Sequence, residues 1–284
     1  MNIKHYFKRI AQAVRYAKIA YRDGGYSSVN ISYPLCDNIL KGKNILITGG
    51  SSGIGLAIAK KCAKSGANIL ITGRNREKLE RAVEEIGRSC CNFLVWDISS
   101  VIDIESKLKE CQFIFGGEIS VLVNNAGIPP MKFWGKVDET EWDTIYSTNL
   151  KGLFFLSQAI VKTWEKQNLT EYRKILNISS QGGFVGATYP YRMVKWDIRG
   201  LTEGLGKELI KKRIIVNGIA PGVVKTQMQE FSLRQGDNLY TKQNLIERVI
   251  LPDEVAELAL FLISDASNAI VGQTIICDGG YTLK

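Results

Sequence analysis

Seven short apolar runs, separated by stretches long enough for helices, constrain the fold of this chain more than any other feature. The runs are rich in Ile and Val and do not alternate with polar residues, so we expect strands that are buried on both faces. They lie at 44–48, 68–72, 91–97, 119–125, 174–179, 213–219 and 273–278. Stretches such as 75–87 and 252–264 have helical patterns. Strands that alternate with helices predict an α/β fold with a doubly wound, seven-stranded parallel sheet.

The first 42 residues have a different pattern from the rest. Apolar residues recur there at steps of four and three, which places them on one stripe of a helix: Ile3, Phe7, Ile10, Val14, Ala17 and Tyr21. Glycines at 24 and 25 end that pattern. We therefore predict a basic amphipathic helix with a connector over 1–42 and one α/β domain over 43–284. We favour packing of this helix on the domain or on a second subunit over contact with an anionic membrane surface or an organellar targeting role.

Charge is concentrated in the same arm. The chain carries a formal net charge of +9, but residues 1–43 hold eight basic side chains against two acidic ones. The remaining 241 residues therefore have a net charge of only +3. This distribution argues against a core domain that binds nucleic acid.

Composition also excludes several classes of site. The single histidine, His5, lies in the arm, so neither a Ser-His-Asp triad nor a multi-histidine metal site is expected. The six cysteines form no CxxC pair, and we predict no metal. No apolar run approaches the roughly 18 residues needed to span a bilayer, and the start lacks a secretory signal pattern. We expect a cytoplasmic protein.

A glycine-rich turn follows the first predicted strand directly. Residues 48–55 read TGGSSGIG and lead into a helical pattern. A turn of this kind lets the backbone approach a pyrophosphate, and the free N–H groups of the helix N-terminus face its charge. The alternative is a tight turn that binds nothing. The position between strand and helix favours a dinucleotide site.

The end of the second predicted strand bears on which dinucleotide binds. Sites that prefer NAD usually carry an acid there, which takes the ribose 2′-hydroxyl. This chain has Gly73 followed by Arg74, and a guanidinium suits a 2′-phosphate. We therefore expect NADP(H) to be favoured over NAD(H). The alternative is that Arg74 is a solvated residue at the start of a surface helix.

Tyr191 and Lys195 form the clearest candidate for catalysis. They are four positions apart, so on a helix they face the same side, and no other tyrosine of this chain has lysine at the fourth position. A nearby ammonium favours the phenolate and so helps a tyrosine to exchange protons near neutral pH. Ser180, at the end of the preceding strand, could place a hydroxyl beside the phenol.

The ordered motifs resemble those of the classical short-chain dehydrogenase/reductase family. They are TGGSSGIG, NNAG at 124–127, Asn149 in STNL, ISS at 178–180, YRMVK at 191–195, PGVVKT at 221–226 and the closing DGG at 278–280. The resemblance covers about 43–284. It implies a single Rossmann-type domain and an NAD(P)-dependent oxidoreductase that transfers hydride between nicotinamide and a carbonyl or secondary alcohol.

The family implies a role for each of four residues. Tyr191 would be the general acid that protonates the carbonyl oxygen, and the base in the reverse direction. Lys195 would lower the pKa of Tyr191 and hold the ribose next to the nicotinamide. Ser180 would orient the substrate oxygen. Asn149 would help to hold a water that relays protons through Lys195.

The resemblance also implies the cofactor contacts. The positions that match the family's motifs are Gly49, Ser51, Ser52, Gly53, Ile54 and Gly55 in the turn, Arg74, Asp97 and Ile98 at the adenosine, Asn125, Ala126 and Gly127 after the fourth strand, Tyr191 and Lys195 at the ribose, and Pro221, Gly222, Val224 and Thr226 at the carboxamide.

The chain departs from the usual pattern in two places that matter. Ser52 replaces the basic residue that often accompanies NADP use, so the cofactor preference rests on Arg74. Ser180 and Tyr191 are eleven positions apart, which is short for the family, and Ser179 is the alternative if Ser180 is displaced. Because this loop lines the substrate site, the substrate cannot be transferred from relatives.

The segment after Thr226 corresponds to the family's variable substrate lid. It is mostly polar, which favours a polar or polyhydroxylated ketone over a long acyl chain or a steroid. The apolar or aromatic side chains that could contact substrate, or equally serve packing, are Met228, Phe231, Leu233 and Tyr240 in the lid, with Met131, Phe133, Trp134, Phe184, Tyr189 and the polar Gln181 outside it.

Two other functions remain as alternatives. One is a regulatory protein that binds the cofactor without turnover, and the other is an epimerase or dehydratase of the same fold. The complete set of Asn149, Ser180, Tyr191 and Lys195 argues against the first. The resemblance further implies a homotetramer or at least a homodimer.

Overall fold

The computed structural model describes residues 38–226, 228 and 243–283, together with Ile10, Ala11, Ala13, Val14 and Ala17. The chain divides into two compact units, Met1–Tyr33 and Pro34–Lys284, which we describe separately. In the first unit the five described residues are helical and exposed. The rest of the predicted stripe (Ile3, Phe7 and Tyr21) lies outside the described residues. The domain boundary at residue 42 stays a prediction.

The second unit contains the predicted seven-stranded parallel sheet, in the order β3-β2-β1-β4-β5-β6-β7. All six strand pairs are parallel. The strands are β1 Asn44–Thr48, β2 Asn68–Gly73, β3 Cys91–Val95, β4 Val121–Asn124, β5 Arg173–Ile178, β6 Ile214–Pro221 and β7 Thr274–Cys277. The predicted doubly wound fold is confirmed.

The repeated NILIT segments show how local sequence sets the register of the sheet. β1 and β2 pair so that Asn44 lies beside Asn68 and Thr48 beside Thr72, which places each residue next to its identical partner. Their apolar side chains are fully buried on both faces, as expected of central strands in a parallel sheet.

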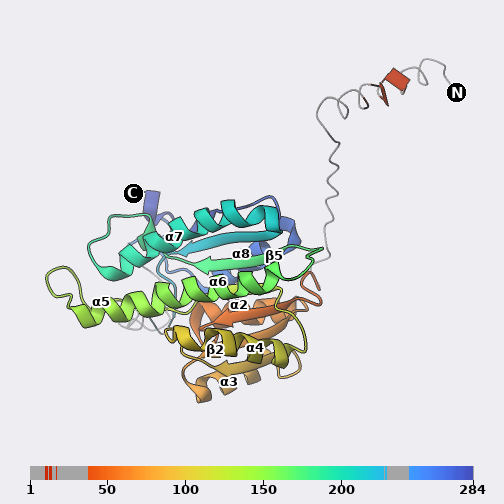
Figure 1. Ribbon diagram of the computed structural model, residues 1–284. Coiled ribbons are helices and arrows are strands. Elements are labelled where there is room, and N and C mark those ends of the chain that lie inside the picture. Colours follow the sequence, from red (N-terminus) through yellow and green to blue (C-terminus); the bar gives the residue numbers. More distant parts are fainter. Residues whose placement is uncertain are drawn as a thin grey trace. The chain divides into compact units, whose positions relative to one another are not determined.

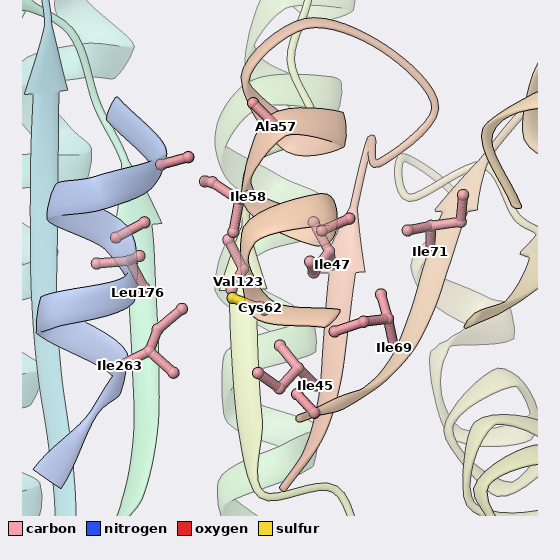
Figure 2. Close-up of a cluster of buried hydrophobic side chains, with 14 of the residues drawn as sticks. Ile45, Ile47, Ala57, Ile58, Cys62, Ile69, Ile71, Val123, Leu176 and Ile263 are labelled. Atoms are coloured by element: carbon pink, nitrogen blue, oxygen red, sulfur yellow. The ribbon is translucent and has the colours of Figure 1, made fainter. Parts of the chain in front are cut away.

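Helices cover both faces of the sheet (Figure 1). One core cluster joins the sheet to α2, α3 and α8, and the other joins it to α4, α6 and α7. The cluster beneath α2 and α8 is shown in Figure 2, where Ile45, Ile47 and Ile69 meet Ile58 and Cys62. The longer helices are α2 Gly53–Lys64, α3 Arg76–Ile86, α4 Ile104–Phe115, α5 Glu139–Tyr146, α6 Gly152–Glu165, α7 Pro190–Leu209 and α8 Pro252–Ile263.

Shorter helical turns complete the unit. A π-helical turn, η2, joins α5 to α6 over Ser147–Lys151. Other short turns among the described residues are the 3-10 helices at Val101–Asp103, Gln181–Gly183, Ile210–Lys212, Asp265–Ser267 and Tyr281–Leu283.

The strand order reverses between β1 and β4, and this reversal positions the site. The chain winds from β1 outward to β3 and then crosses back to β4 on the other side of β1. The loops that leave β1 and β4 therefore diverge, and a crevice opens at the carboxyl ends of these strands, where ligands bind in open α/β sheets.

A buried polar network ties the sheet to two helices close to that crevice. The Asn124 amide of β4 donates to Ser157 of α6 at 3.0 Å and to Asn177 of β5 at 2.9 Å. The Asn177 amide in turn donates to Thr202 of α7 at 2.9 Å. Because unpaired polar groups are costly inside a protein, this network fixes how α6 and α7 sit on the sheet.

Candidate active site

A cavity of about 360 Å³ lies at the carboxyl ends of the strands and gathers almost all of the predicted site residues. Its lining comes from the loops after β1 to β6 and from α7. Every predicted cofactor or catalytic position lines this cavity except Gly55 and Asn149.

The glycine-rich turn needs glycine for close packing. Gly49 has φ of +66°, and a Cβ there would lie 2.8 Å from the Cα of Ala126. A Cβ on Gly55 would lie 2.4 Å from the side-chain nitrogen of Asn125, which donates to the carbonyls of Thr48 and Gly49 at 3.0 Å. Gly55 therefore packs behind the turn, which explains why it does not line the cavity.

The N-terminus of α2 is left free to receive an anion. Its N-cap residue, Ser52, makes no side-chain hydrogen bond to the first turn, and that turn holds no acidic residue. By contrast, the first turns of α3 and α5 are capped by Asn75 and Asp138. Uncapped N–H groups that face a glycine-lined cavity fit a pyrophosphate. This end of the cavity therefore fits a dinucleotide.

The part of the cavity beyond β2 and β3 is lined by Arg74, Asp97 and Ile98. The Asp97 carboxylate accepts hydrogen bonds from the backbone N–H and the hydroxyl of Ser99, at 3.0 and 2.8 Å. Gly73 also lines the cavity, and the atoms nearest to a Cβ built there are 3.6 Å away. A side chain at position 73 would therefore find room.

The segment after β6 closes the cavity on the opposite side. Pro221, Gly222, Val224 and Thr226 all line it. A Cβ on Gly222 would lie 2.8 Å from the Cα of Asp278, so this turn depends on glycine. Val224 forms a bridge with Ile250, which fixes the start of the segment.

Tyr191, Ser180 and Lys195 lie together at the end of β5 and the start of α7. The Tyr191 phenol is hydrogen-bonded to Ser180. The Lys195 ammonium lies 5.5 Å from the centre of the Tyr191 ring and donates to the Ile178 carbonyl at 3.0 Å. The Ser179 hydroxyl instead donates to the Lys195 carbonyl at 2.8 Å. The short loop therefore leaves Ser180, not Ser179, beside the phenol.

Burial sets the protonation of both groups. It raises the pKa of Tyr191 above its usual value, and the Ser180 hydrogen bond offsets this only in part. Burial also lowers the pKa of Lys195 to about 8. The sequence led us to expect a lowered pKa for Tyr191, but in the protein alone desolvation of the phenolate is the largest effect and raises this pKa. A phenol that stays protonated is suited to donate a proton.

Asn149 holds the wall of the cavity and is not among the residues that line it. Its side chain lies in the π-helical turn, accepts from the Ile128 N–H at 2.7 Å and donates to the Ile128 carbonyl at 3.0 Å. Ile128 itself lines the cavity. The Glu141 carboxylate supports the same loop by accepting from the N–H groups of Met131 and Lys132 at 2.8 and 3.1 Å.

Of the predicted substrate contacts that fall within the described residues, only Met228 lines the cavity. The rings of Phe133 and Tyr189 meet edge to face, with their centres 5.0 Å apart. Tyr189 precedes Tyr191 by two residues. The other predicted contacts in the described chain, Gln181, Phe184, Met131 and Trp134, are not among the lining residues. Phe231, Leu233 and Tyr240 lie outside the described residues.

Several lining residues were not among the predicted ones. Asn75 and Lys78 come from the start of α3, Trp96 from the end of β3, Thr148 from the π-helical turn, and Thr72, Ile128 and Ile178 complete this set. Most of them are neighbours of predicted positions and could have been found by extension. Lys78 could not, because it looks like one more charge on an exposed helix.

In the described part of the chain, no helix is long and apolar enough to cross a membrane. No three His, Cys, Asp or Glu side chains in it gather as metal ligands would.

Known proteins resemble the chain over nearly all of the α/β domain. A family model described as enoyl-(acyl carrier protein) reductase matches residues 49–282. The 3-oxoacyl-[acyl-carrier-protein] reductase FabG of Aquifex aeolicus is 33% identical over 246 residues, which cover 85% of this chain and 98% of the relative. Gluconate 5-dehydrogenase of Gluconobacter oxydans is 32% identical over 254 residues, which cover 86% and 96%.

Solved structures agree with this likeness. A Brucella melitensis protein described as a short-chain dehydrogenase/reductase and glucose/ribitol dehydrogenase superposes with a TM-score of 0.78 at 29% identity. The superposition covers 86% of this chain and 98% of that one. The region matched by the family model holds every described residue that lines the cavity.

Proposed function

Because the chain belongs to the classical short-chain dehydrogenase/reductase family and is thereby an NAD(P)-dependent oxidoreductase, we propose that it reduces a ketone to a secondary alcohol with Tyr191 as the general acid. The observation that carries this proposal is the partly buried Tyr191 phenol. It is hydrogen-bonded to Ser180 and lies beside Lys195, in the same cavity as the glycine-rich turn.

The residues of this chain would divide the work as follows. The bound nicotinamide supplies the hydride, and α2, the glycine-rich turn and the 221–226 segment would hold the dinucleotide. Ser180 and Tyr191 would donate hydrogen bonds to the substrate oxygen and so orient it. Tyr191 would then release its proton to that oxygen as negative charge develops.

Lys195 would act on Tyr191 through its charge. Its ammonium favours the phenolate that remains after proton transfer. Asn149 would maintain the cavity wall at Ile128, and we propose that it also helps to hold a water that returns a proton through Lys195.

Tyr191→Phe tests the mechanism. The substitution removes only the hydroxyl, so we expect kcat for ketone reduction to fall by about a thousandfold, within the range for lost general acid catalysis. Binding of NADPH, measured by fluorescence titration, should change little. Turnover close to that of the unmodified protein would overturn the assignment of Tyr191. A Tyr189→Phe variant, which changes the neighbouring tyrosine, is the matched control.

We also propose that NADP(H) is preferred over NAD(H), because Arg74 lines the cavity and Gly73 offers no acid. A paired titration with NADPH and NADH tests this, with tighter binding of NADPH expected. Gly73→Asp supplies the missing acid where there is room for a side chain, so it should shift the affinity ratio toward NADH by at least about tenfold. Equal binding of both cofactors by the unmodified protein would contradict the proposal.

For the substrate we propose a polar, polyhydroxylated ketone. The mostly polar sequence of 227–250 supports this class. The names of the relatives do not decide the substrate, because they include both gluconate 5-dehydrogenase and 3-oxoacyl-[acyl-carrier-protein] reductase. Comparing kcat/KM for sugar-derived keto acids and for 3-oxoacyl thioesters decides between them, and a clear preference for the thioester would refute the proposed class.

The oxidoreductase assignment is favoured over a cofactor-binding regulator or an epimerase. The relatives named above are a reductase and a dehydrogenase. Oxidation of one NADPH for each ketone consumed would exclude both alternatives.

We further propose a homodimer or homotetramer. A groove lined by α5, α6 and α7 exposes Phe154, Phe155 and Trp196 beside Lys151 and Asp197. Apolar side chains flanked by charges of both signs suit a self-complementary contact across a twofold axis. Phe155→Glu should lower the mass measured by light scattering. A monomeric unmodified protein would refute assembly, and an unchanged mass in the variant would place the contact elsewhere.

A further inference from the structure

Besides Arg74 and Lys195, the cavity is lined by a third basic side chain, Lys78, that none of the sequence motifs indicates. We propose that Lys78 binds the 2′-phosphate of NADP(H) together with Arg74 and so helps to determine cofactor specificity. This inference rests on the proposed preference for NADP(H).

Lys78 and Arg74 are brought together by the start of α3. Arg74 follows the last residue of β2, and Lys78 is the third residue of α3. The Asn75 side chain accepts a hydrogen bond from the Lys78 backbone N–H at 2.9 Å. This bond caps the helix and fixes the backbone position of Lys78. Both cations line the cavity at this end, with the hydroxyl residues Ser51 and Ser52.

The other basic side chains of this segment are already engaged. Arg76 pairs with Glu80 at 3.7 Å and lies over the Phe93 ring at 5.5 Å. Arg81 pairs with Glu77 at 3.6 Å. Within the described part of the chain, Arg74 and Lys78 have no carboxylate partner. Asp97 is the one acid among the described residues that line the cavity, and it is bonded to Ser99.

Charge balance gives the physical reason for two cations. A phosphate monoester carries a charge between about −1.5 and −2 near pH 7, more than one guanidinium can balance. A lysine in the first turn of a helix is also unfavourably placed against the helix dipole, and a bound dianion reverses that effect. The first turn of α3 is therefore better suited to a phosphate than to an unliganded state.

The experiment compares Lys78→Met with Arg81→Met, which removes one charge from the same helix at a position that does not line the cavity. Kd values for NADPH and NADH come from fluorescence titration, and those for 2′,5′-ADP and 5′-ADP from calorimetry. We expect Lys78→Met to raise Kd for NADPH and 2′,5′-ADP by about five- to tenfold, in keeping with a partly exposed charged contact. NADH and 5′-ADP should change less than about twofold, as should all four ligands in Arg81→Met.

Two further variants define the role of Lys78. Lys78→Arg keeps the charge and should retain the preference for NADPH. Combined with Arg74→Met, Lys78→Met should show coupling, because both side chains contact one phosphate.

The outcomes separate this inference from the cofactor proposal. If the unmodified protein binds NADPH and NADH equally, the NADP(H) preference fails and Lys78 has no phosphate to bind. In the other outcome, the unmodified protein prefers NADPH while Lys78→Met leaves the ratio of the two Kd values unchanged. In that case Arg74 alone accounts for the preference, and the assignment of Lys78 is overturned. Melting temperatures of each variant confirm that the fold is kept.

Discussion

Two buried lysines lie at opposite ends of strand β5 and look alike in isolation. Lys174 is the second residue of the strand, and Lys195 of α7 donates to the carbonyl of its last residue, Ile178. Their exposed fractions are 3% and 6%. Burial lowers the pKa of each to about 8.

The neighbours of the two ammonium groups differ. Lys174 donates to the Ser264 carbonyl and, at 3.1 Å, to the Ser267 hydroxyl, and Asp265 partly offsets the effect of burial on its pKa. Lys195 donates to one acceptor in the described chain, lines the cavity and lies beside Tyr191. An ammonium has three donors, so Lys195 keeps capacity for a ligand.

A perturbed pKa is therefore not enough to identify a functional lysine in this protein. Structural and catalytic lysines can show the same shift, because desolvation causes both. Unused donors in a cavity, next to a second titratable group, distinguish Lys195 from Lys174.

The largest expected difference between the two lysines is in turnover. Lys195→Met should lower kcat for ketone reduction by about a hundredfold or more, because Tyr191 loses the charge that favours its phenolate. Lys174→Met, at the opposite end of the strand, should keep kcat within about twofold. Steady-state rates at pH 7 measure both. Equal losses in the two variants would mean that Lys195 also acts only through the fold.

The pH dependence of the free energy of unfolding tests the burial of Lys174. Above pH 8 folded Lys174 is neutral, while the unfolded lysine stays protonated up to about pH 10.5, so the unfolded chain binds more protons in this window. Lys174 should therefore add up to about 3 kcal/mol to the free energy of unfolding as pH rises from 8 to 10.5, and impose that cost below pH 8.

Denaturant unfolding of the unmodified protein and of Lys174→Met across this range measures the effect. Other groups also titrate in this range, and the difference between the two curves isolates Lys174. The stability of the unmodified protein relative to Lys174→Met should rise with pH between 8 and 10.5. A difference that does not change with pH would show that Lys174 titrates normally.

The smallest expected effect is on the pH profile. kcat/KM for reduction should fall about tenfold per pH unit once Lys195 loses its proton above pH 8, while the raised pKa of Tyr191 keeps the phenol protonated. The profile of Lys174→Met should match that of the unmodified protein. A shift of the falling limb in Lys174→Met would mean that the two ends of β5 are electrostatically coupled.

The sequence predicts the sheet well because its central strands are buried on both faces. The 44–48 run coincides with β1, and the other runs overlap their strands with shifts of a few residues at the ends. Glycine positions such as Gly49 were also predictable, because only glycine lets two backbone segments approach this closely.

What the sequence could not show depends on contacts between distant segments. Lys174 looks like an edge charge of its strand, yet packing of α8 buries it. Lys78 looks like part of a solvated helix face, and only the bend after β2 brings it to the cavity with Arg74. The effect of burial on Tyr191 also needed the packed structure, because spacing shows only that Lys195 is near.

Because a lysine is hydrogen-bonded at each end of β5, an error in the register of this strand would affect stability and activity together. A slip of the strand by one residue would turn every side chain to the opposite face. Lys174 would lose Ser264 and Ser267 at the same moment as the carbonyl bonded to Lys195 moved away from α7. A misregistered molecule would thus be inactive as well as unstable. We expect specific activity to report directly the fraction of correctly folded molecules in any preparation.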